Sequence, residues 1–324
     1  MYHKFSATDD GVGGAGVIKA QIQKGGRGRG TFDNGFYGGI HFVKDLKQGT
    51  EKASKMLGHR LKTSQTAEQG PLVKQLYIAE QVSPAEEWYL AITIDRENYC
   101  PVIAISKKGG MNIEDIARES PDDVFTFPLA YGEGVNKEVL DSIQEQLSLS
   151  PTTTHNLKDI LVPLWAIFKE KEAILLEVNP LALLPSQGFM PLDAKFTFDD
   201  AASSRQPELF ALRDAEHEVA EEVEAEKYGL VYVRLEGNIG NVVNGAGLAM
   251  ATNDAIGLHG GSSANFLDAG GQATKETMMQ AFKIILADKR VTAILVNIYG
   301  GNVLRGIGNR ISKLTGFKAS LNAT

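Results

Sequence analysis

The sequence predicts an α/β protein of at least two domains, the second of which is built on a parallel sheet. Its 324 residues exceed the roughly 100 to 200 residues that are typical of one domain. Segment 174–195 reads as two apolar strands joined by a tight turn. From residue 230 onward, strand and helix patterns alternate, which is typical of βαβ units with right-handed crossovers.

The composition excludes several classes of protein. With 43% hydrophobic and 23% charged residues, the chain has the make-up of an ordinary globular protein. A net charge of -7 with scattered basic residues argues against nucleic acid as the main partner. No apolar run reaches the roughly 18 residues that span a bilayer, so we expect no membrane partner. The single cysteine, Cys100, excludes internal disulfides and fits a reducing compartment.

Near the N-terminus, a short strand over 16–21 runs into a basic, glycine-rich loop over 24–30. Strand alternation puts Lys19 on the opposite face from Ile18 and Ala20. The glycines let the backbone approach a ligand closely, and the arginines offer planar donors to phosphate. The segment therefore predicts a phosphate-binding loop, although it lacks the Walker A pattern. A mobile hairpin tip is the alternative interpretation.

Further elements of the first half follow from apolar spacing and from helix stop signals. We expect strands over 39–43, 72–79, 87–95 and 101–106, and helices over 45–57, 135–147 and 157–168. Glu87 opens a strand after a polar connection, where its carboxylate can accept ribose hydroxyls or simply be solvated. Trp165 and Phe168 belong to the apolar stripe of the last helix, so we assign both to the core.

The predicted hairpin carries polar side chains on one face. If its turn is centred near residue 186, the numbers of paired residues sum to about 372. Asn179 then faces Asp193, and Glu177 faces Lys195. Because strand side chains alternate, all four share one face. Carboxylate and amide oxygens suit Mg²⁺ better than zinc. An ordinary hairpin with one polar face is the alternative.

The second half begins with segment 214–227, which is acidic on every side and predicts a polar helix at a domain boundary. Strands are then expected over 230–235, 265–268 and 291–298, with helices over 245–258 and 274–287. A glycine-rich loop follows each strand, at 237–240 leading to Asn244, at 270–271 and at 300–301. Ligands bind at the carboxyl ends of parallel strands, so we predict a binding site there. Glycines that relieve helix–sheet crowding are the alternative.

Several motifs gain meaning in combination. They are Lys-Ala-Gln with Gly-Gly-Arg-Gly in 19–28, Leu-Glu-Val-Asn-Pro at 176–180, Leu-Asp-Ala-Lys at 192–195, Gly-Asn-Ile-Gly and Val-Asn-Gly-Ala-Gly-Leu-Ala-Met in 237–250, and Ala-Asn-Phe-Leu-Asp at 264–268. Over residues 15–301 the chain resembles the beta subunits of succinyl-CoA synthetases (succinate-CoA ligases). The resemblance implies an ATP-grasp region (1–213), an acidic linker helix (214–227), a flavodoxin-like CoA-ligase domain (228–303) and a divergent tail (304–324).

The same resemblance implies roles for individual residues. The phosphates of the nucleotide would be bound by Lys19 and by the backbone of Gly26, Arg27 and Gly28. The nucleoside would be bound by the backbone around Ala79 and Val82 and by Glu87. Mg²⁺ would be ligated by Asn179 and Asp193, and the carboxylic substrate by Asn244 with Gly301, Asn302 and Val303. Glu177 is our candidate for steering the phosphoryl acceptor.

The implied reaction is the reversible conversion of succinyl-CoA, phosphate and a nucleoside diphosphate into succinate, CoA and ATP or GTP, in the tricarboxylic acid cycle. The phosphoryl group would pass through a histidine of an alpha subunit, and no histidine here lies in a matching motif. The amino-acid sequence of 109–119 resembles that of mitochondrial members of the family, which implies that the protein is located in the mitochondrial matrix. Compared with the family pattern, stretches before Lys19 and after Gly301 are absent, so we expect an incomplete ATP-grasp domain and a truncated CoA-ligase domain. A malate-CoA ligase beta subunit and a non-catalytic nucleotide-binding fragment are the alternatives.

Overall fold

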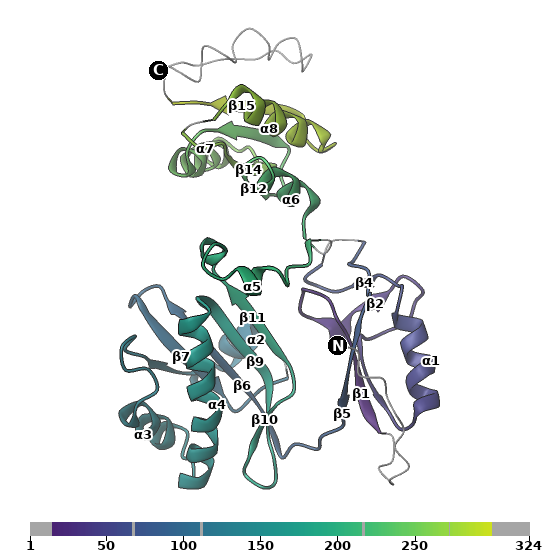
Figure 1. The fold of residues 1–324 in the computed structure, drawn as a ribbon, viewed down its shortest axis with the longest axis vertical. Helices are drawn as coiled ribbons and strands as arrows, with labels where there is room; N and C mark the ends of the chain where they lie inside the picture. The colour runs from purple at the N-terminus through teal and green to yellow at the C-terminus, as the bar shows by residue number, and fades with distance from the viewer. Residues whose placement is uncertain (1–14, 67–68, 111–112, 216–217, 272, 300–324) are drawn as a thin grey trace. The chain divides into compact units, whose positions relative to one another are not determined.

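The computed structural model describes residues 15–66, 69–110, 113–215, 218–271 and 273–299, and most of the helices and strands are labelled in Figure 1. The chain divides into two compact units. The first contains 26–64, 73–213 and the segment before residue 22, while the second contains 22–25, 65–72 and everything from Asp214 onward. The division at Asp214 coincides with the point where the composition turns acidic.

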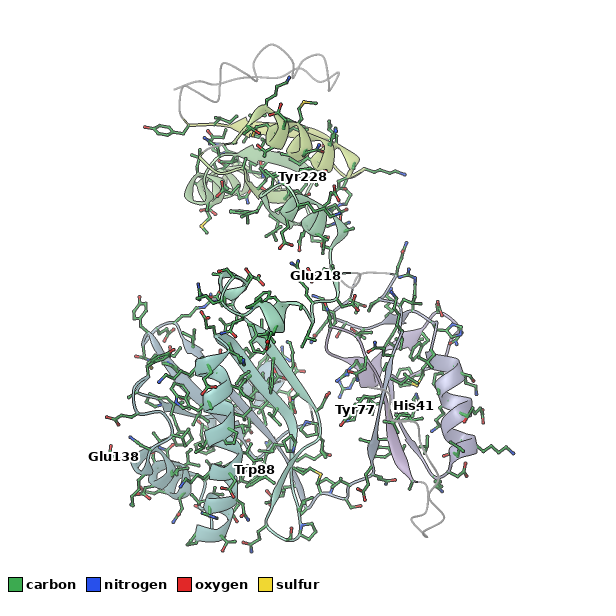
Figure 2. The ribbon with its side chains drawn as sticks, in the orientation of Figure 1. His41, Tyr77, Trp88, Glu138, Glu218 and Tyr228 are labelled. Atoms are coloured by element: carbon green, nitrogen blue, oxygen red, sulfur yellow. The ribbon has the colours of Figure 1, made fainter. Side chains whose placement is uncertain are left out.

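The first unit contains a three-stranded antiparallel sheet of order β3-β1-β5. Its strands are β1 (Gly16–Ala20), β3 (Ile40–Val43) and β5 (Leu76–Glu80), and β2 (Thr31–Phe32) pairs with β4 (Leu61–Lys62) beside it. Helix α1 (Leu46–Met56) begins where the Asp45 carboxylate accepts the Gln48 N–H at 2.8 Å, and it packs on the face that carries Ile18. His41 pairs with Ile18 and Tyr77 with Lys19, so Lys19 and Tyr77 lie on the face away from α1 (Figure 2).

A six-stranded sheet forms the rest of the first unit. Its strands are β6 (Glu86–Asp95), β7 (Cys100–Ser106), β8 (Phe125–Pro128), β9 (Ala173–Leu183), β10 (Phe189–Pro191) and β11 (Ala194–Phe198), and its helices are α2 (Ile113–Glu119), α3 (Lys137–Gln146), α4 (Pro151–Glu170) and α5 (Pro207–Phe210). Helices α3 and α4 cover a core in which Leu157, Leu161 and Leu176 are fully buried. Phe168 is buried there and Trp165 stacks on it at 5.7 Å, so the assignment of both to the core is confirmed.

The hairpin register is confirmed. Lys195 pairs with Glu177 and Ala194 with Val178, and the Asn179 N–H donates to the Asp193 carbonyl at 3.0 Å. Strand β9 lies centrally, between β6 on one side and β10 with β11 on the other. Of the four side chains that we predicted to share one face, Glu177 and Asn179 therefore belong to this central strand, Lys195 belongs to β11, and Asp193 directly precedes β11.

The second unit is a four-stranded sheet of order β12-β14-β13-β15. Its strands are β12 (Val231–Arg234), β13 (Ile239–Val243), β14 (Asn265–Asp268) and β15 (Ala293–Asn297), and its helices are α6 (Ala220–Glu226), α7 (Ala246–Leu258) and α8 (Lys275–Ala287). Strands β13, β14 and β15 form the parallel sheet that we expected, whereas β12, at the edge, is antiparallel to β14. None of the helices in the described ranges has the length and apolar character needed to cross a membrane.

Strand β13 occupies the place where we expected a glycine-rich loop at 237–240. Gly240 lies inside the strand, and a Cβ there would come within 2.5 Å of Ile285 Cγ2 on α8. This glycine therefore serves close packing between helix and sheet, which is the alternative that the sequence left open.

The acidic helix also differs from our expectation. Helix α6 covers only 220–226, and Ala225 is fully buried in the same core as Leu230 and Ile285. Two of its acidic residues contact Arg234 of β12: Glu222 accepts the Arg234 N–H at 2.9 Å, and Glu221 pairs with the Arg234 guanidinium at 3.7 Å. The helix is therefore part of the second unit, with Ala225 packed in the core of that unit, and not a polar linker.

A bulge separates β13 from β14. The two strands pair at Ile239–Ser263 and at Val243–Asp268. Between these two pairs, the β14 side of the sheet therefore contains one residue more than the β13 side. Between these points the Asn265 side chain replaces the ladder: its Oδ1 accepts the Asn241 N–H and its Nδ2 donates to the Asn241 carbonyl, each at 2.9 Å. Both asparagines are buried, and the backbone groups left by the bulge are thus satisfied.

Candidate functional site

The basic loop meets the hairpin within the first unit. Lys19 Nζ donates to the Leu192 carbonyl, in the turn between β10 and β11. The Arg27 guanidinium donates through Nη1 to the Ala20 carbonyl at 3.0 Å and pairs through Nη2 with the Asp193 carboxylate. Arg27, one of the residues assigned to phosphate, is therefore in direct contact with Asp193, which was assigned to the metal, and Lys19 contacts the residue next to Asp193.

The side-chain amine of Lys19 is buried close to charged side chains of both signs. Only 7% of this residue is exposed, and burial lowers the pKa of its ammonium group. The Asp193 carboxylate opposes this shift in the Lys19 pKa, the Arg27 guanidinium adds to it, and the Glu87 carboxylate again opposes it. A phosphate group, which carries negative charge and accepts hydrogen bonds, is the kind of ligand that this arrangement favours.

The basic loop is itself a hydrogen-bonded turn. Gly26 adopts φ +75°, a conformation that glycine tolerates without steric cost. The Arg29 N–H donates to the Gly26 carbonyl at 3.1 Å, and the Gly39 N–H donates to the Arg27 carbonyl at 2.8 Å. These bonds fix the path of the chain through Gly28, which is exposed.

Asn179 is held by a glycine pair that the sequence analysis missed. Its Oδ1 accepts the Gly110 N–H at 2.8 Å. A Cβ at Gly109 would lie 2.3 Å from the Trp88 carbonyl oxygen, and one at Gly110 would lie 2.5 Å from Glu87 Oε2. The chain after β7 can pass over the start of β6 only because Gly109 lacks a side chain, while Gly110 adopts φ +71°, which favours glycine. Two consecutive glycines directly after a strand were the available signal.

Glu177 lies beside these residues and is half-buried. Burial raises the pKa of its carboxyl; Lys195 opposes the shift, Glu114 adds to it, a hydrogen bond with Asn179 opposes it and Asp193 adds to it. Glu177 therefore releases its proton less readily than an ordinary glutamate.

The donor set of the hairpin fits Mg²⁺ when phosphate oxygens and water complete its shell. Asp193 and Asn179 offer a carboxylate and an amide oxygen from facing positions, with the Glu177 carboxylate close enough to affect both. Within the described residues no group of three or more His, Cys, Asp or Glu side chains is arranged to hold a metal. Mg²⁺ commonly takes one or two protein carboxylates and keeps several waters or phosphate oxygens, so this small set is compatible with it.

The residues assigned to the nucleoside lie at the end of β5 and beyond. Ala79 pairs with Val17, and its strand is at the edge of the sheet. Val82 is half-buried in the connection between β5 and β6, and Glu87 is exposed near the start of β6. The structure thus places all three in one short stretch of the first unit.

The second unit presents a separate cluster where its parallel strands end. Asn244, which is 8% exposed, follows β13. Its Oδ1 accepts the Tyr299 N–H and its Nδ2 donates to the Tyr299 carbonyl, both at 2.8 Å. Asp268, at the end of β14, accepts the Gly245 and Gly270 N–H groups. The sequence did not single out Asp268, and Gly301, Asn302 and Val303 lie outside the described residues.

Comparison with known proteins gives the family. An ATP-grasp domain model matches residues 5–183 and a CoA-ligase model matches 242–312. The fold resembles ATP citrate lyase from Methanothrix soehngenii in complex with citrate and coenzyme A, with a TM-score of 0.61 over 89% of this chain and 69% of that chain, at 19% identity.

Named relatives are much closer in sequence. The ADP-forming succinate-CoA ligase beta subunit of Neurospora crassa mitochondria is 46% identical over 89% of this chain and 64% of its own length. The equivalent subunit of Saccharomyces cerevisiae is 44% identical over 89% and 68%, and the GDP-forming one of Dictyostelium discoideum 42% over 94% and 74%. The chain thus spans about two thirds of the length of these relatives, and it belongs to the family of succinate-CoA ligase beta subunits, with an ATP-grasp domain followed by a CoA-ligase domain.

Proposed function

We propose that this chain is the nucleotide-binding beta subunit of a succinate-CoA ligase of the mitochondrial matrix. It would catalyse, with an alpha subunit, the reversible reaction of succinyl-CoA, phosphate and ADP or GDP to succinate, CoA and the triphosphate. The observation that carries this proposal is the Arg27–Asp193 pair, together with the Lys19–Leu192 hydrogen bond. These contacts bring the phosphate loop to the metal-binding hairpin, as a site for a metal-bound nucleotide requires.

Each part of the first unit then has a role in phosphoryl transfer, which depends on positioning and charge neutralisation more than on covalent chemistry. Lys19 and the amides of 26–28 bind the phosphates, the backbone at Ala79 and Val82 holds the base, and Glu87 binds the ribose. Asn179 and Asp193 hold Mg²⁺, which neutralises charge on the terminal phosphates when bound. We place this nucleotide region in 1–213 and the CoA-ligase domain in 228–303.

Glu177 steers the phosphoryl acceptor, a histidine of the alpha subunit. As a carboxylate, Glu177 accepts the N–H of one ring nitrogen, which leaves the other nitrogen free to attack. The raised pKa of Glu177 makes it a better proton acceptor than an ordinary glutamate. Asn244 would contact the carboxylic substrate, together with Gly301, Asn302 and Val303.

The test is reconstitution with the alpha subunit from the same source. We expect Mg²⁺-dependent transfer of the terminal phosphate of ATP or GTP to the alpha subunit, and turnover with succinate and CoA only when both subunits are present. Faster turnover of malate than succinate would identify a malate-CoA ligase instead. Magnesium-dependent nucleotide binding without any transfer would indicate a non-catalytic fragment, and turnover by the chain alone would contradict the subunit assignment.

A further inference from the structure

Asp268 connects two loops at the carboxyl ends of the parallel strands. Its Oδ1 accepts the Gly245 N–H at 2.6 Å and the Gly270 N–H at 2.7 Å. Gly245 immediately precedes α7, and Gly270 belongs to the loop that follows β14. One carboxylate oxygen thus joins the loop after β13 to the loop after β14.

The conformation that Asp268 holds is one that the backbone does not prefer by itself. Gly245 adopts φ +136° and ψ +129°, and Gly270 adopts φ +73°. Glycine populates many other conformations at similar cost, so the hydrogen bonds to Asp268 favour these: the bond to Gly270 is local, two residues along the chain, and the bond to Gly245 comes from the neighbouring strand. Because both bonds end on the same oxygen, the two glycines move or stay together.

Asn244 directly precedes Gly245, and part of its side-chain amide group is already hydrogen-bonded within the protein. The two hydrogen bonds with the Tyr299 backbone occupy its oxygen and one proton of its NH₂ group. An amide nitrogen carries two donors, so one N–H of Asn244 remains for a ligand. The direction of that N–H is set by Tyr299 on one side and by the fixed Gly245 on the other.

We propose that Asp268 is the positioning residue of the carboxylic-acid site: it locks the Gly245 and Gly270 amides and so aims the remaining Asn244 N–H at the substrate carboxylate. This inference rests on the proposed function, because it takes the acid site to be at Asn244. It also means that the Gly245 and Gly270 amides are occupied by Asp268 and do not serve as donors to the substrate.

The test compares Asp268→Ala with Asp268→Asn in the reconstituted complex. Asparagine retains an oxygen at the Oδ1 position, so Asp268→Asn keeps the acceptor while Asp268→Ala removes it. We expect Asp268→Ala to raise the KM for the carboxylic acid by about 10- to 100-fold, the size of effect that a displaced positioning group produces, and Asp268→Asn to restore most of it. Nucleotide-driven phosphorylation of the alpha subunit is expected to be unchanged in both. Asp254→Ala, which alters an exposed acid on α7, is the matched control and is expected to match the wild type.

Amide hydrogen exchange of the isolated chain supplies a readout that does not need activity. We expect faster exchange at Gly245 and Gly270 in Asp268→Ala and wild-type exchange in Asp268→Asn. The inference is overturned if the wild-type complex is active and Asp268→Ala leaves the KM for the acid unchanged, or if phosphorylation by nucleotide falls equally. A wild-type complex that phosphorylates the alpha subunit but never turns over a carboxylic acid overturns the proposed function itself, and with it this inference.

Discussion

The two candidate sites are built on different principles. In the first unit, charged side chains bind one another, as Arg27 binds Asp193. Main-chain contacts are also present there, but among the described residues of the second unit no such charged pair occurs in the contacts of Asn244 and Asp268, which are all with main-chain groups: Asn244 binds Tyr299, and Asp268 binds two glycine amides. A charged ligand at the first site must therefore replace contacts within the protein, whereas a ligand at the second meets loops that are already fixed. Charge matters at the first site, and hydrogen-bonding shape matters at the second.

The largest effect is expected for Asp193→Asn in the first unit, and the same substitution at Asp268 in the second unit serves as its comparison. Asp193→Asn removes a negative charge that faces Arg27 and, in our proposal, Mg²⁺. Interactions with charged groups are worth about 1.5–3 kcal/mol, which is about 10- to 100-fold in an equilibrium or rate. We expect Mg²⁺-dependent phosphorylation of the alpha subunit by nucleotide to fall by that factor, as measured by transfer of labelled phosphate.

Asp268→Asn is the matched change in the second unit. Because the acceptor oxygen is retained, phosphorylation by nucleotide should equal that of the wild type in the same assay. If Asp193→Asn and Asp268→Asn reduced phosphorylation of the alpha subunit equally, the carboxylate charge would matter equally in both units. That result would contradict the distinction drawn above.

A smaller but still large effect is expected for Asn265→Ala, which removes the side chain that fills the bulge. The N–H and carbonyl of buried Asn241 lose their partners, and each unsatisfied group costs about 1–3 kcal/mol. We expect hydrogen exchange of peptides from 239–268 to report that the free energy of local opening falls by about 2–6 kcal/mol, the sum for two groups. Both tryptophans, Trp88 and Trp165, lie in the first unit, so urea unfolding followed by tryptophan fluorescence should be unchanged.

Asn238→Ala is the control for that variant, since its side chain makes one exposed hydrogen bond with Thr292. It should alter protection by less than about 1 kcal/mol. A similar loss in both variants would mean that the bulge does not depend on Asn265.

The smallest effect concerns the pH dependence of stability in the first unit. The pKa of Glu177 is raised above 4.5 in the folded protein. Between pH 4.5 and that raised value, the folded state binds a proton that the unfolded state has released, so stability falls as pH rises. We expect Glu177→Gln to remove this component, so that the urea midpoint followed by tryptophan fluorescence falls less steeply above pH 4.5 than in the wild type. A steeper fall would contradict the direction of the shift.

The sequence was most informative where structure is local. A hairpin register follows from turn position and alternation, so Asn179 and Asp193 could be placed together without coordinates. The helix that apolar spacing and a stop signal predicted over 45–57 is observed at Leu46–Met56. These inferences needed only neighbours in the chain.

The failures involve partners that are distant in the chain. Gly240 and Asn241 read as loop residues, but they lie inside a strand because Ile285 packs on the first and Asn265 pairs with the second. The direction of β12 depends on its pairing with β14, which no local pattern encodes. The Gly110–Asn179 contact joins residues far apart in sequence. In each case the deciding interaction was tertiary.

The bulge between β13 and β14 has a consequence for how this sheet can change over time. Elsewhere in a sheet, strands are joined by backbone groups that every amino acid except proline supplies in full, so a substitution rarely removes the hydrogen bond itself. Here part of the connection is made by a side chain, Asn265, and a single codon change can remove it. A point mutation at Asn265 can therefore loosen this stretch of the sheet, whereas a point mutation in the backbone-paired stretches on either side, unless it is to proline, leaves their hydrogen bonds in place.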